Sequence, residues 1–457
     1  MALMPPQDSM FLIPESREQP MHVGSLQLFE LPEGADRSLI RETYEELLGT
    51  TDIAPLFRRR PHRSWSTAGQ WAWVDDDDVD LEHHVRHSGL PEPGRVRELL
   101  ALVSRLHGTL LDRQRPLWEM HVIEGLTENR FAVYTKLHHS LMDGISGLRL
   151  LQRTLSPDPD NRSQPTFWEP ALHKRRRSSG DGGGLTALPS AAVHAAADML
   201  KLAPKTLRIL ERGIREQQTM LPLQAPRSML NVPITGARRF AAQSWSLERI
   251  KSIAKSSDAT VNDVLLAMSA GALRAYLLEQ GQLPDRDLVA MTPVSLRRDD
   301  DEESTGNAVG TILCNLATTE SDPGRRLERI HASMQQGKDL FAGLDQLQAT
   351  AVSAAMMLPL LLTFAPGGLG GLTPPPYNLV ISNVPGPTQP LYWNGAKLQG
   401  VYPLSIPTMY QALNLTVTSY AGNMEFGLIG CRRSVPHLQR LLTHLEDALA
   451  DLEKAVA

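Results

Sequence analysis

Apolar and polar positions alternate in the first part of the chain and then recur with helical spacing. The run 21–29 alternates well enough to predict a strand, and further strand-like segments follow at 118–124 and 131–138. A helix is expected over 145–155. Another helix is expected between residues 95 and 111, where one stripe carries Val96, Leu99, Leu100, Val103, Leu106 and Leu110. Strands and helices therefore mix in this part, which we delimit as a lobe over residues 1–160.

The pattern changes over residues 161–230, which we interpret as a linker with a helical crossover. Prolines, the basic run 174–177 and the glycine-rich run 178–184 predict a mobile segment. One or two helices follow between Ala187 and Gln218, with leucines beside lysines and arginines. The preferred interpretation is a crossover that packs on the two lobes. The alternative is a basic amphipathic surface for anionic lipid.

Residues 231–457 show the same mixture of patterns and form the second predicted lobe. A helix is expected over 247–254, another begins after Thr260, and a final one begins at Pro436 and carries a leucine stripe. Strands are expected at 239–245, 288–292, 310–318, 377–382, 413–420 and 425–430. The expected fold class is therefore α/β, with two lobes of mixed sheets flanked by helices.

Composition changes this picture only by excluding classes of protein. The net charge is −5, from 46 basic and 51 acidic residues, so no nucleic-acid partner is expected. The 2 cysteines, Cys314 and Cys431, cannot form a disulfide framework, and a reducing cytoplasm is the simpler interpretation. Residues 1–16 lack the basic and apolar regions of a secretory signal. Prolines and glycines interrupt the most apolar stretch, 351–372, so a membrane span is not expected.

The candidate chemistry lies at the end of the predicted strand 131–138, in the run KLHHSLMDG. If strand pleating persists, His139 shares a face with Val133 and Leu137, and His138 points the other way. An imidazole at a strand end, with a pKa near neutrality, suits a general base that takes a proton from a hydroxyl. Asp143 is expected to hold the following loop, directly or through an ion pair with an arginine such as Arg297. Gly144 is expected to permit a sharp turn into the next helix.

Two other interpretations apply to adjacent histidines. One is that such a pair has only a structural role, because a second pair occurs at His83-His84, which we interpret as surface residues. Metal binding is the other alternative, but neighbouring strand positions point to opposite faces, and no cysteine or Glu-x-x-His partner is close in sequence. No metal is therefore expected.

The same segment carries a resemblance to a known family. HHSLMDG matches the HHxxxDG motif of the chloramphenicol acetyltransferase-like superfamily, which includes peptide-synthetase condensation domains. The wider pattern resembles the bacterial wax ester synthase/diacylglycerol acyltransferase family. The marks of that family appear in order: PMHVG at 20–24, PLWE at 116–119, Asn262-Asp263, PVSLR at 293–297 and NVPGP at 383–387.

This resemblance implies a fold and a mechanism. It implies two superfamily-type lobes with a tunnel at their interface, which acyl-CoA enters from one side and the alcohol from the other. It implies that His139 deprotonates the alcohol for direct attack on the thioester, that His138 supports it, and that Asp143 and Gly144 are structural. Acyl-CoA is then a substrate, and no cofactor is expected.

Further site residues have both a functional and an ordinary interpretation. Asn262, in the first turn of a helix capped by Thr260, could donate to the oxyanion, or Asn262 and Asp263 are simply good helix-start residues. Trp118 and Glu119 support the tunnel wall or belong to an ordinary strand. The remaining candidates are Asn383, in a proline-rich loop near the tunnel, and Arg297, a ligand for CoA phosphates or a surface arginine.

One segment superficially resembles the nucleophile elbow of a serine hydrolase. The run Ala267-Met268-Ser269-Ala270-Gly271 has the required small residues, but it falls in the middle of a predicted helix. We interpret it as core packing.

The expected function is an acyl-CoA-dependent O-acyltransferase that makes wax esters from long-chain alcohols, triacylglycerol from diacylglycerol, or both. We expect the protein in the cytoplasm, peripherally associated with the inner membrane or lipid bodies, with a homodimer as a further expectation. Two alternatives stay open: a condensation-type acyltransferase that uses another thioester donor and acceptor, and a non-catalytic lipid-binding protein.

Overall fold

The computed structural model describes residues 2–173, 223–295, 309–341 and 373–457, and between the last two ranges only 344, 348, 349, 352, 353 and 356. The chain divides into two compact units. Unit 1 combines Met1–Lys174, Pro233–Arg249 and Asn383–Leu442; unit 2 combines Arg175–Val232, Ile250–Ser382 and Thr443–Ala457. Much of the predicted linker, including the basic run 174–177, and most of the apolar stretch 351–372 lie outside the described residues. The lobe boundaries at 160 and 230 stay a prediction.

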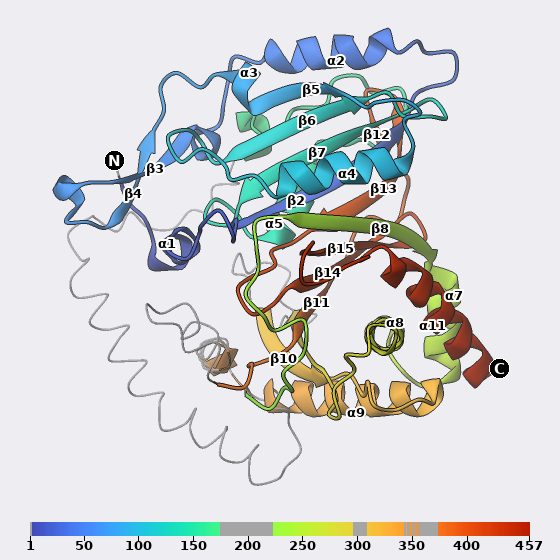
Figure 1. Cartoon of the computed structure of the whole chain (residues 1–457). Helices are drawn as coiled ribbons and strands as arrows, with labels where there is room; N and C mark the ends of the chain where they lie inside the picture. The colour runs from blue at the N-terminus through green and yellow to red at the C-terminus, as the bar shows by residue number, and fades with distance from the viewer. Residues whose placement is uncertain are drawn as a thin grey trace. The chain divides into compact units, whose positions relative to one another are not determined.

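Unit 1 is built around a six-stranded sheet (Figure 1). Its strands pair antiparallel except for the edge pair β5·β6, which is parallel. The central strand β7 is buried on both faces along nearly its whole length, including its polar residues Thr135, Lys136 and His138. The order is β12 (Tyr392–Trp393), β13 (Ala396–Leu404), β2 (His22–Glu30), β7 (Arg130–His138), β6 (Trp118–Glu124) and β5 (Val85–Gly89).

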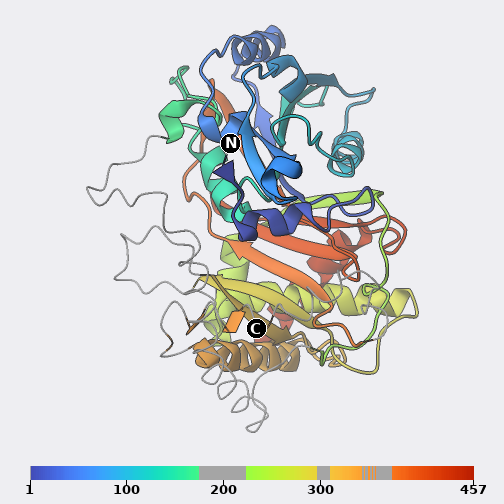
Figure 2. The ribbon, with the colours of Figure 1, turned by 90° about the vertical axis from the view of Figure 1, so that its left-hand side faces the viewer.

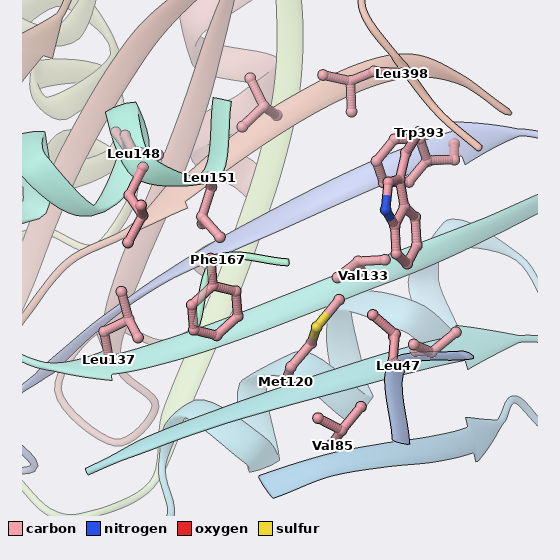
Figure 3. Packing of buried hydrophobic residues seen from close by; sticks show 14 of the residues in the cluster. Leu47, Val85, Met120, Val133, Leu137, Leu148, Leu151, Phe167, Trp393 and Leu398 are labelled. Atoms are coloured by element: carbon pink, nitrogen blue, oxygen red, sulfur yellow. The ribbon is translucent and has the colours of Figure 1, made fainter. Parts of the chain in front are cut away.

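One face of this sheet carries the largest apolar core of the unit. Phe131, Val133 and Leu137 point to it from β7, and they pack with leucines of α2 (Ser38–Leu48) and α5 (Gly144–Gln152). Figure 3 shows Leu148 and Leu151 of α5 near Leu137. At the edge of the unit, α2 lies over β5 and β6 (Figures 1 and 2).

The other face of the sheet carries a second core. Ala132 and Tyr134 of β7 pack there with Leu99 and Val103 of α4 (Val96–His107). This core also contains side chains of a second antiparallel set, in the order β14 (Leu413–Tyr420), β15 (Asn423–Cys431) and β8 (Arg238–Ser246).

A small satellite structure completes unit 1. It contains the three-stranded sheet β1 (Ala2–Leu3), β4 (Trp71–Asp75) and β3 (Arg59–Arg63), together with α1 (Pro6–Leu12) and α3 (Leu81–His84). Met4, Leu12 and Trp73 form its apolar cluster with Leu111 and Leu117. Because Leu117 precedes β6, this cluster joins the N-terminal segment to the main sheet.

Unit 2 contains the strands β10 (Val309–Asn315), β9 (Val289–Ser295) and β11 (Leu379–Val384) and the helices α8 (Val261–Glu279) and α9 (Pro323–Phe341). The unit boundaries fall within β11, α7 (Leu247–Ser256) and α11 (Arg440–Val456). Among the described residues, α8 is the one helix long and apolar enough to cross a membrane, but 72% of its apolar window is buried. Such burial is typical of a core helix.

The α/β class and the mixed sheets flanked by helices are confirmed. The interpretation of the run 267–271 as core packing is also confirmed, because Ser269 is buried in α8 and its hydroxyl donates to the Leu265 carbonyl at 2.8 Å. The helix α9 is absent from the predicted elements. Its signal was present, since Leu327, Ile330 and Met334 have helical spacing and are buried.

Candidate active site

The backbone of the two motif histidines is fixed at the end of β7. The amide of His138 donates to the carbonyl of Leu117 at 3.0 Å, and the amide of His139 donates to the carbonyl of Met21 at 2.9 Å. Leu117 and Met21 immediately precede β6 and β2, the two neighbours of β7. The sheet therefore holds both histidines from both sides.

The two histidine side chains have different surroundings, although β7 ends at His138 and His139 is the first residue of the following turn, so the predicted strand pleating does not extend to His139. Val133 and Leu137 lie in one core, and Tyr134 lies in the other. His138 bonds to Glu15, whereas the His139 ring stacks on Phe11 of α1, with ring centroids 4.0 Å apart and planes 21° apart. The adjacent imidazoles therefore contact different side chains, a carboxylate for His138 and an aromatic ring for His139.

His138 is fully buried and hydrogen-bonded at both ring nitrogens. The Ser140 amide donates to Nδ1 at 3.1 Å, so Nδ1 is an acceptor and Nε2 carries the proton. Nε2 donates to Oε1 of Glu15 at 3.1 Å. Because both nitrogens are engaged, His138 fixes the strand end and is not available as a base.

Glu15 is a site residue absent from the sequence predictions. Its side chain is 2% exposed, and its Oε2 is 2.9 Å from Nη2 of Arg113, which also donates from Nε. Oε1 accepts from the Met21 amide at 3.1 Å. Burial acts to raise the pKa of Glu15, but the hydrogen bonds from His138, Met21 and Arg113 lower it overall, so the group is ionised. The residues around Glu15 in sequence gave no signal, because the contact with His138 spans 123 positions.

His139 as a whole is half-buried, but one of its two ring nitrogens is completely buried. Nδ1 is inaccessible and has no hydrogen-bond partner within the described part of the chain. Burial lowers the pKa of His139 to about 4, against the opposing effects of its own backbone and of the charge of Asp143. The ring is therefore neutral near pH 7, which is the form that accepts a proton.

Asp143 is the N-cap of α5. Its Oδ1 accepts from the Ser146 amide at 2.8 Å, and its Oδ2 accepts from the Ser146 hydroxyl at 2.8 Å. The ion pair with Arg297 stays a prediction, because Arg297 lies outside the described residues. As a cap, Asp143 determines where α5 begins, and so where the loop after His139 ends.

The expectation that Gly144 permits a sharp turn is wrong. The φ angle of Gly144 is not positive, and a Cβ there would lie 3.9 Å from Cγ1 of Val23, an ordinary contact. The chain enters α5 through the Asp143 cap with backbone angles that any residue adopts.

Trp118 and Glu119 lie in β6 with different surroundings. Trp118 is fully buried, donates from Nε1 to the Phe57 carbonyl at 2.9 Å, and stacks on His84 with centroids 4.4 Å apart. His84 is 1% exposed, so the interpretation of the His83-His84 pair as surface residues is wrong for His84. A histidine beside a tryptophan face has little access to water, and burial lowers the pKa of His84 to about 4.

Glu119 belongs to a buried polar layer on the His138 face of the sheet. Its Oε2 is 2.9 Å from Nζ of Lys136, which is fully buried and also donates to the carbonyl of Thr109 at 3.1 Å. Burial acts to raise the pKa of Glu119, but the hydrogen bond with His121 and the charge of Lys136 lower it to about 2. Two ion pairs, Glu15–Arg113 and Glu119–Lys136, thus lie on this face close to the motif.

Asn262 and Asp263 belong to unit 2, at the start of α8. Thr260 is the N-cap, and Oδ2 of Asp263 accepts from the Thr260 amide at 2.9 Å in a capping box. The same oxygen lies 2.8 Å from Nδ1 of His331 in α9. Asp263 is fully buried and Asn262 is half-buried. The ordinary interpretation of Asp263, as a helix-start residue, agrees with these contacts; the oxyanion role of Asn262 stays a prediction.

Asn383 is half-buried near the end of β11. After it, the amide of Gly386 donates to the Ser419 hydroxyl at 2.9 Å, and a Cβ on Gly386 would lie 2.1 Å from the Ser419 carbonyl oxygen. Only glycine permits this close approach of two backbones. The proline-rich segment is therefore held against the end of β14.

Comparison with known proteins identifies the family. Residues 4–265 match the model of the wax ester synthase/diacylglycerol acyltransferase catalytic domain, and residues 305–453 match that of the C-terminal domain of the same family. A Mycobacterium tuberculosis protein named probable diacylglycerol O-acyltransferase tgs2 is 54% identical over 456 residues, covering 100% of both chains.

Solved structures agree. The wax ester synthase/diacylglycerol acyltransferase from Marinobacter aquaeolei VT8 is 42% identical, with a TM-score of 0.78 and 100% of both chains covered. The first condensation domain of the CDA synthetase is 16% identical, with a TM-score of 0.58 over 100% of this chain and 95% of that one, and shares the fold. The chain therefore belongs to the wax ester synthase/diacylglycerol acyltransferase family, and it is an acyltransferase.

Proposed function

We propose that this protein transfers a fatty acyl group from acyl-CoA directly to the hydroxyl of a long-chain alcohol, of diacylglycerol, or of both, with His139 as general base. The observation that carries the proposal is a half-buried imidazole directly after β7 whose lowered pKa keeps it neutral near pH 7. The relative named diacylglycerol O-acyltransferase and the solved wax ester synthase support the two acceptor classes.

The proposed reaction has two proton transfers. His139 takes the proton of the acceptor hydroxyl as the oxygen attacks the thioester carbonyl. The tetrahedral intermediate then expels the CoA thiolate, which takes the proton from the imidazolium. No acyl-enzyme is formed. The negative charge that develops in the transition state favours the imidazolium, so a ring that is neutral at rest gains basicity when it is needed.

Several residues have positioning or electrostatic roles in this proposal. Phe11 fixes the plane of the His139 ring by stacking. His138 and Glu15 fix the strand end, and Asp143 fixes the start of α5. The amide of Asn262 would donate to the oxyanion, a contribution of roughly 3 kcal/mol in enzymes where it has been tested. The interface tunnel for the two substrates, and the role of Arg297 as a ligand for CoA phosphates, belong to the same proposal.

The place of action also belongs to the proposal. Both acceptors are lipids, so a cytoplasmic protein would meet them at the inner membrane or at lipid bodies, peripherally and as a monomer or homodimer. Co-sedimentation with anionic vesicles measures this association.

The test is a comparison of His139→Ala with wild type, using labelled palmitoyl-CoA and either hexadecanol or dioleoylglycerol. Loss of a general base should lower kcat by roughly 100- to 10,000-fold with both acceptors. His62→Ala, a partly exposed histidine of β3, is the matched control and should keep wild-type activity. Circular dichroism and thermal midpoints check that both variants fold.

Three results would distinguish the alternatives. Wild-type rates in a folded His139→Ala variant would contradict the general-base role. Activity with a carrier-protein thioester but not with palmitoyl-CoA would favour a condensation-type enzyme. Binding of both lipids without any turnover by the wild type would favour a non-catalytic lipid-binding protein.

A further inference from the structure

A basic groove of about 370 Å³ lies on unit 1, apart from the residues of the proposed active site. It runs along α4, which packs beside β8 (Figure 1). The lining contains four arginines from three parts of the chain: Arg105 of α4, Arg238 and Arg239 of β8, and Arg432 just after β15. Leu90, Pro91 and Leu102 add apolar surface to the lining.

The positive charge of this groove is not compensated by its own carboxylate. Glu98 is the acidic residue in the lining, and its Oε2 accepts from the Arg95 amide at 2.9 Å while its Oε1 is 3.3 Å from Nη2 of Arg95. Glu98 is therefore engaged outside the groove. Across the described ranges, Arg105, Arg239 and Arg432 form no ion pair within 4.0 Å. A chain with a net charge of −5 thus gathers four arginines around one groove.

Arg238 supplies a buried part of that charge. The residue is 5% exposed, and its guanidinium donates to two backbone carbonyls, those of Thr235 and, at 2.7 Å, of Glu18. Burial lowers the pKa of Arg238 to about 10, so it is still charged at neutral pH. Its neighbours are these carbonyl oxygens and the thiol of Cys431, and a buried cation with no carboxylate partner is costly unless an anion comes close to it.

We propose that this groove binds a phosphate group of an anionic ligand. The guanidinium group matches two phosphate oxygens at once, which a lysine cannot do. Arg105 and Arg432 are exposed and Arg239 is half-buried, so three guanidinium groups with unpaired charge can reach the ligand. The apolar residues of the lining suit a ligand that carries an apolar part next to its phosphate.

Two sources provide this chemistry. One is the phosphate of an anionic phospholipid headgroup, and the other is a nucleotide phosphate, such as the 3′-phosphoadenosine part of CoA. The groove contains none of Glu15, His138, His139 or Asp143, so the proposal does not depend on His139 as base.

The test measures equilibrium binding of two probes to the full chain. One probe is adenosine 3′,5′-bisphosphate, followed by isothermal titration calorimetry. The other is vesicles of phosphatidylglycerol and phosphatidylcholine, followed by co-sedimentation, with pure phosphatidylcholine vesicles as the neutral comparison. The variants are Arg105→Gln, Arg239→Gln and Arg432→Gln. Arg97→Gln is the matched control, because Arg97 is an exposed arginine of α4 that does not line the groove.

Each groove variant should lower the affinity for the probe that occupies the groove by about 10-fold, as expected for the loss of one charge-assisted hydrogen bond. The affinity of Arg97→Gln for the same probe should stay within about 2-fold of wild type. If the variants bind the bisphosphate more weakly, and their KM for palmitoyl-CoA rises with kcat unchanged, the ligand is a nucleotide. If only binding to anionic vesicles is weakened, the ligand is a headgroup.

The proposal is overturned if neither probe binds the wild type, or if the three groove variants and Arg97→Gln all bind alike. The second result would mean that the overall surface charge, and not the groove, attracts the ligand. Because binding is measured without turnover, failure here leaves the role of His139 untouched. Thermal midpoints within a few degrees of wild type check that the variants are folded.

Discussion

At the scale of single residues, the motif divides two tasks between adjacent histidines. His138 has both ring nitrogens hydrogen-bonded, whereas Nδ1 of His139 is buried without a partner among the described residues. His138 is the last residue of β7, whereas His139 is the first residue of the turn that follows it. His138 meets the ionised carboxylate of Glu15, and His139 meets the ring of Phe11.

A first prediction at this scale concerns Glu15 and Arg113. Glu15→Gln leaves the shape of the side chain but removes the charge that faces Arg113 and His138. Breaking a buried ion pair from one side costs roughly 3 kcal/mol, because the remaining charge is uncompensated. The free energy of unfolding of Glu15→Gln should therefore fall by about that amount, and the rate of ester formation should fall with it. Urea denaturation and the acyltransfer assay measure the two effects.

The double variant Glu15→Gln/Arg113→Gln provides the control. Removing both charges should cost less than the sum of the two single substitutions, because neither charge is then left alone. Additive losses in this cycle would show that the ion pair does not stabilise the strand end.

At the scale of elements, the start of α5 determines where the loop after His139 ends. Asp143 caps the helix through two hydrogen bonds to Ser146, and the next residue, Gly144, needs no special backbone angles. The cap, not the glycine, therefore fixes the strand-to-helix junction.

Asp143→Ala should accordingly lower the free energy of unfolding by about 1 kcal/mol, the usual cost of a lost N-cap, and should also lower activity. Gly144→Ala is the matched comparison and should change the stability by less than that, since a Cβ there meets only Val23 at 3.9 Å. Thermal or urea unfolding of both variants provides the measurement. A larger loss from Gly144→Ala than from Asp143→Ala would reverse this assignment.

At the scale of the whole molecule, unit 1 buries several titratable groups. Burial lowers the pKa of His84 to about 4 and that of His107 to about 3, in addition to His139 at about 4. Glu425 differs, because burial raises its pKa to about 7 even though the Ser244 hydroxyl donates to it.

These shifts predict how stability depends on pH. Between the folded pKa values and the unfolded value of about 6.5, the unfolded histidines bind protons that the folded ones do not. Their contribution to stability is therefore complete above about pH 6.5 and is lost as the pH falls toward 4. Glu425 acts in the opposite sense, because the folded carboxyl holds a proton between about pH 4.5 and 7 that the unfolded one releases.

The free energy of unfolding should thus rise between pH 5 and 6.5, since three histidines outweigh one glutamate. In Glu425→Gln the opposing contribution is gone, so the rise should be steeper by up to about 1.4 kcal/mol per pH unit. Urea denaturation at several pH values measures the slope. A flat profile in wild type, or an unchanged slope in Glu425→Gln, would contradict the assigned burial of these groups.

The amino-acid pattern by itself determined the α/β class, the strand that ends at the histidine pair and the helix that Thr260 caps. These features depend on periodicity and capping over a few neighbouring residues, which a sequence displays directly. The family marks from 20–24 to 383–387 added the expectation of acyl transfer.

Only the tertiary structure decided which groups meet. Glu15 reaches His138 across 123 positions, Arg113 reaches Glu15 across 98, and Asp263 meets His331 across 68. The burial of His84 against Trp118 and the gathering of four arginines in one groove are of the same kind. Such contacts depend on how strands and helices far apart in the chain pack together. Local hydrophobic periodicity carries no information about that packing, so the surroundings that determine the pKa and charge of these groups had to come from the fold.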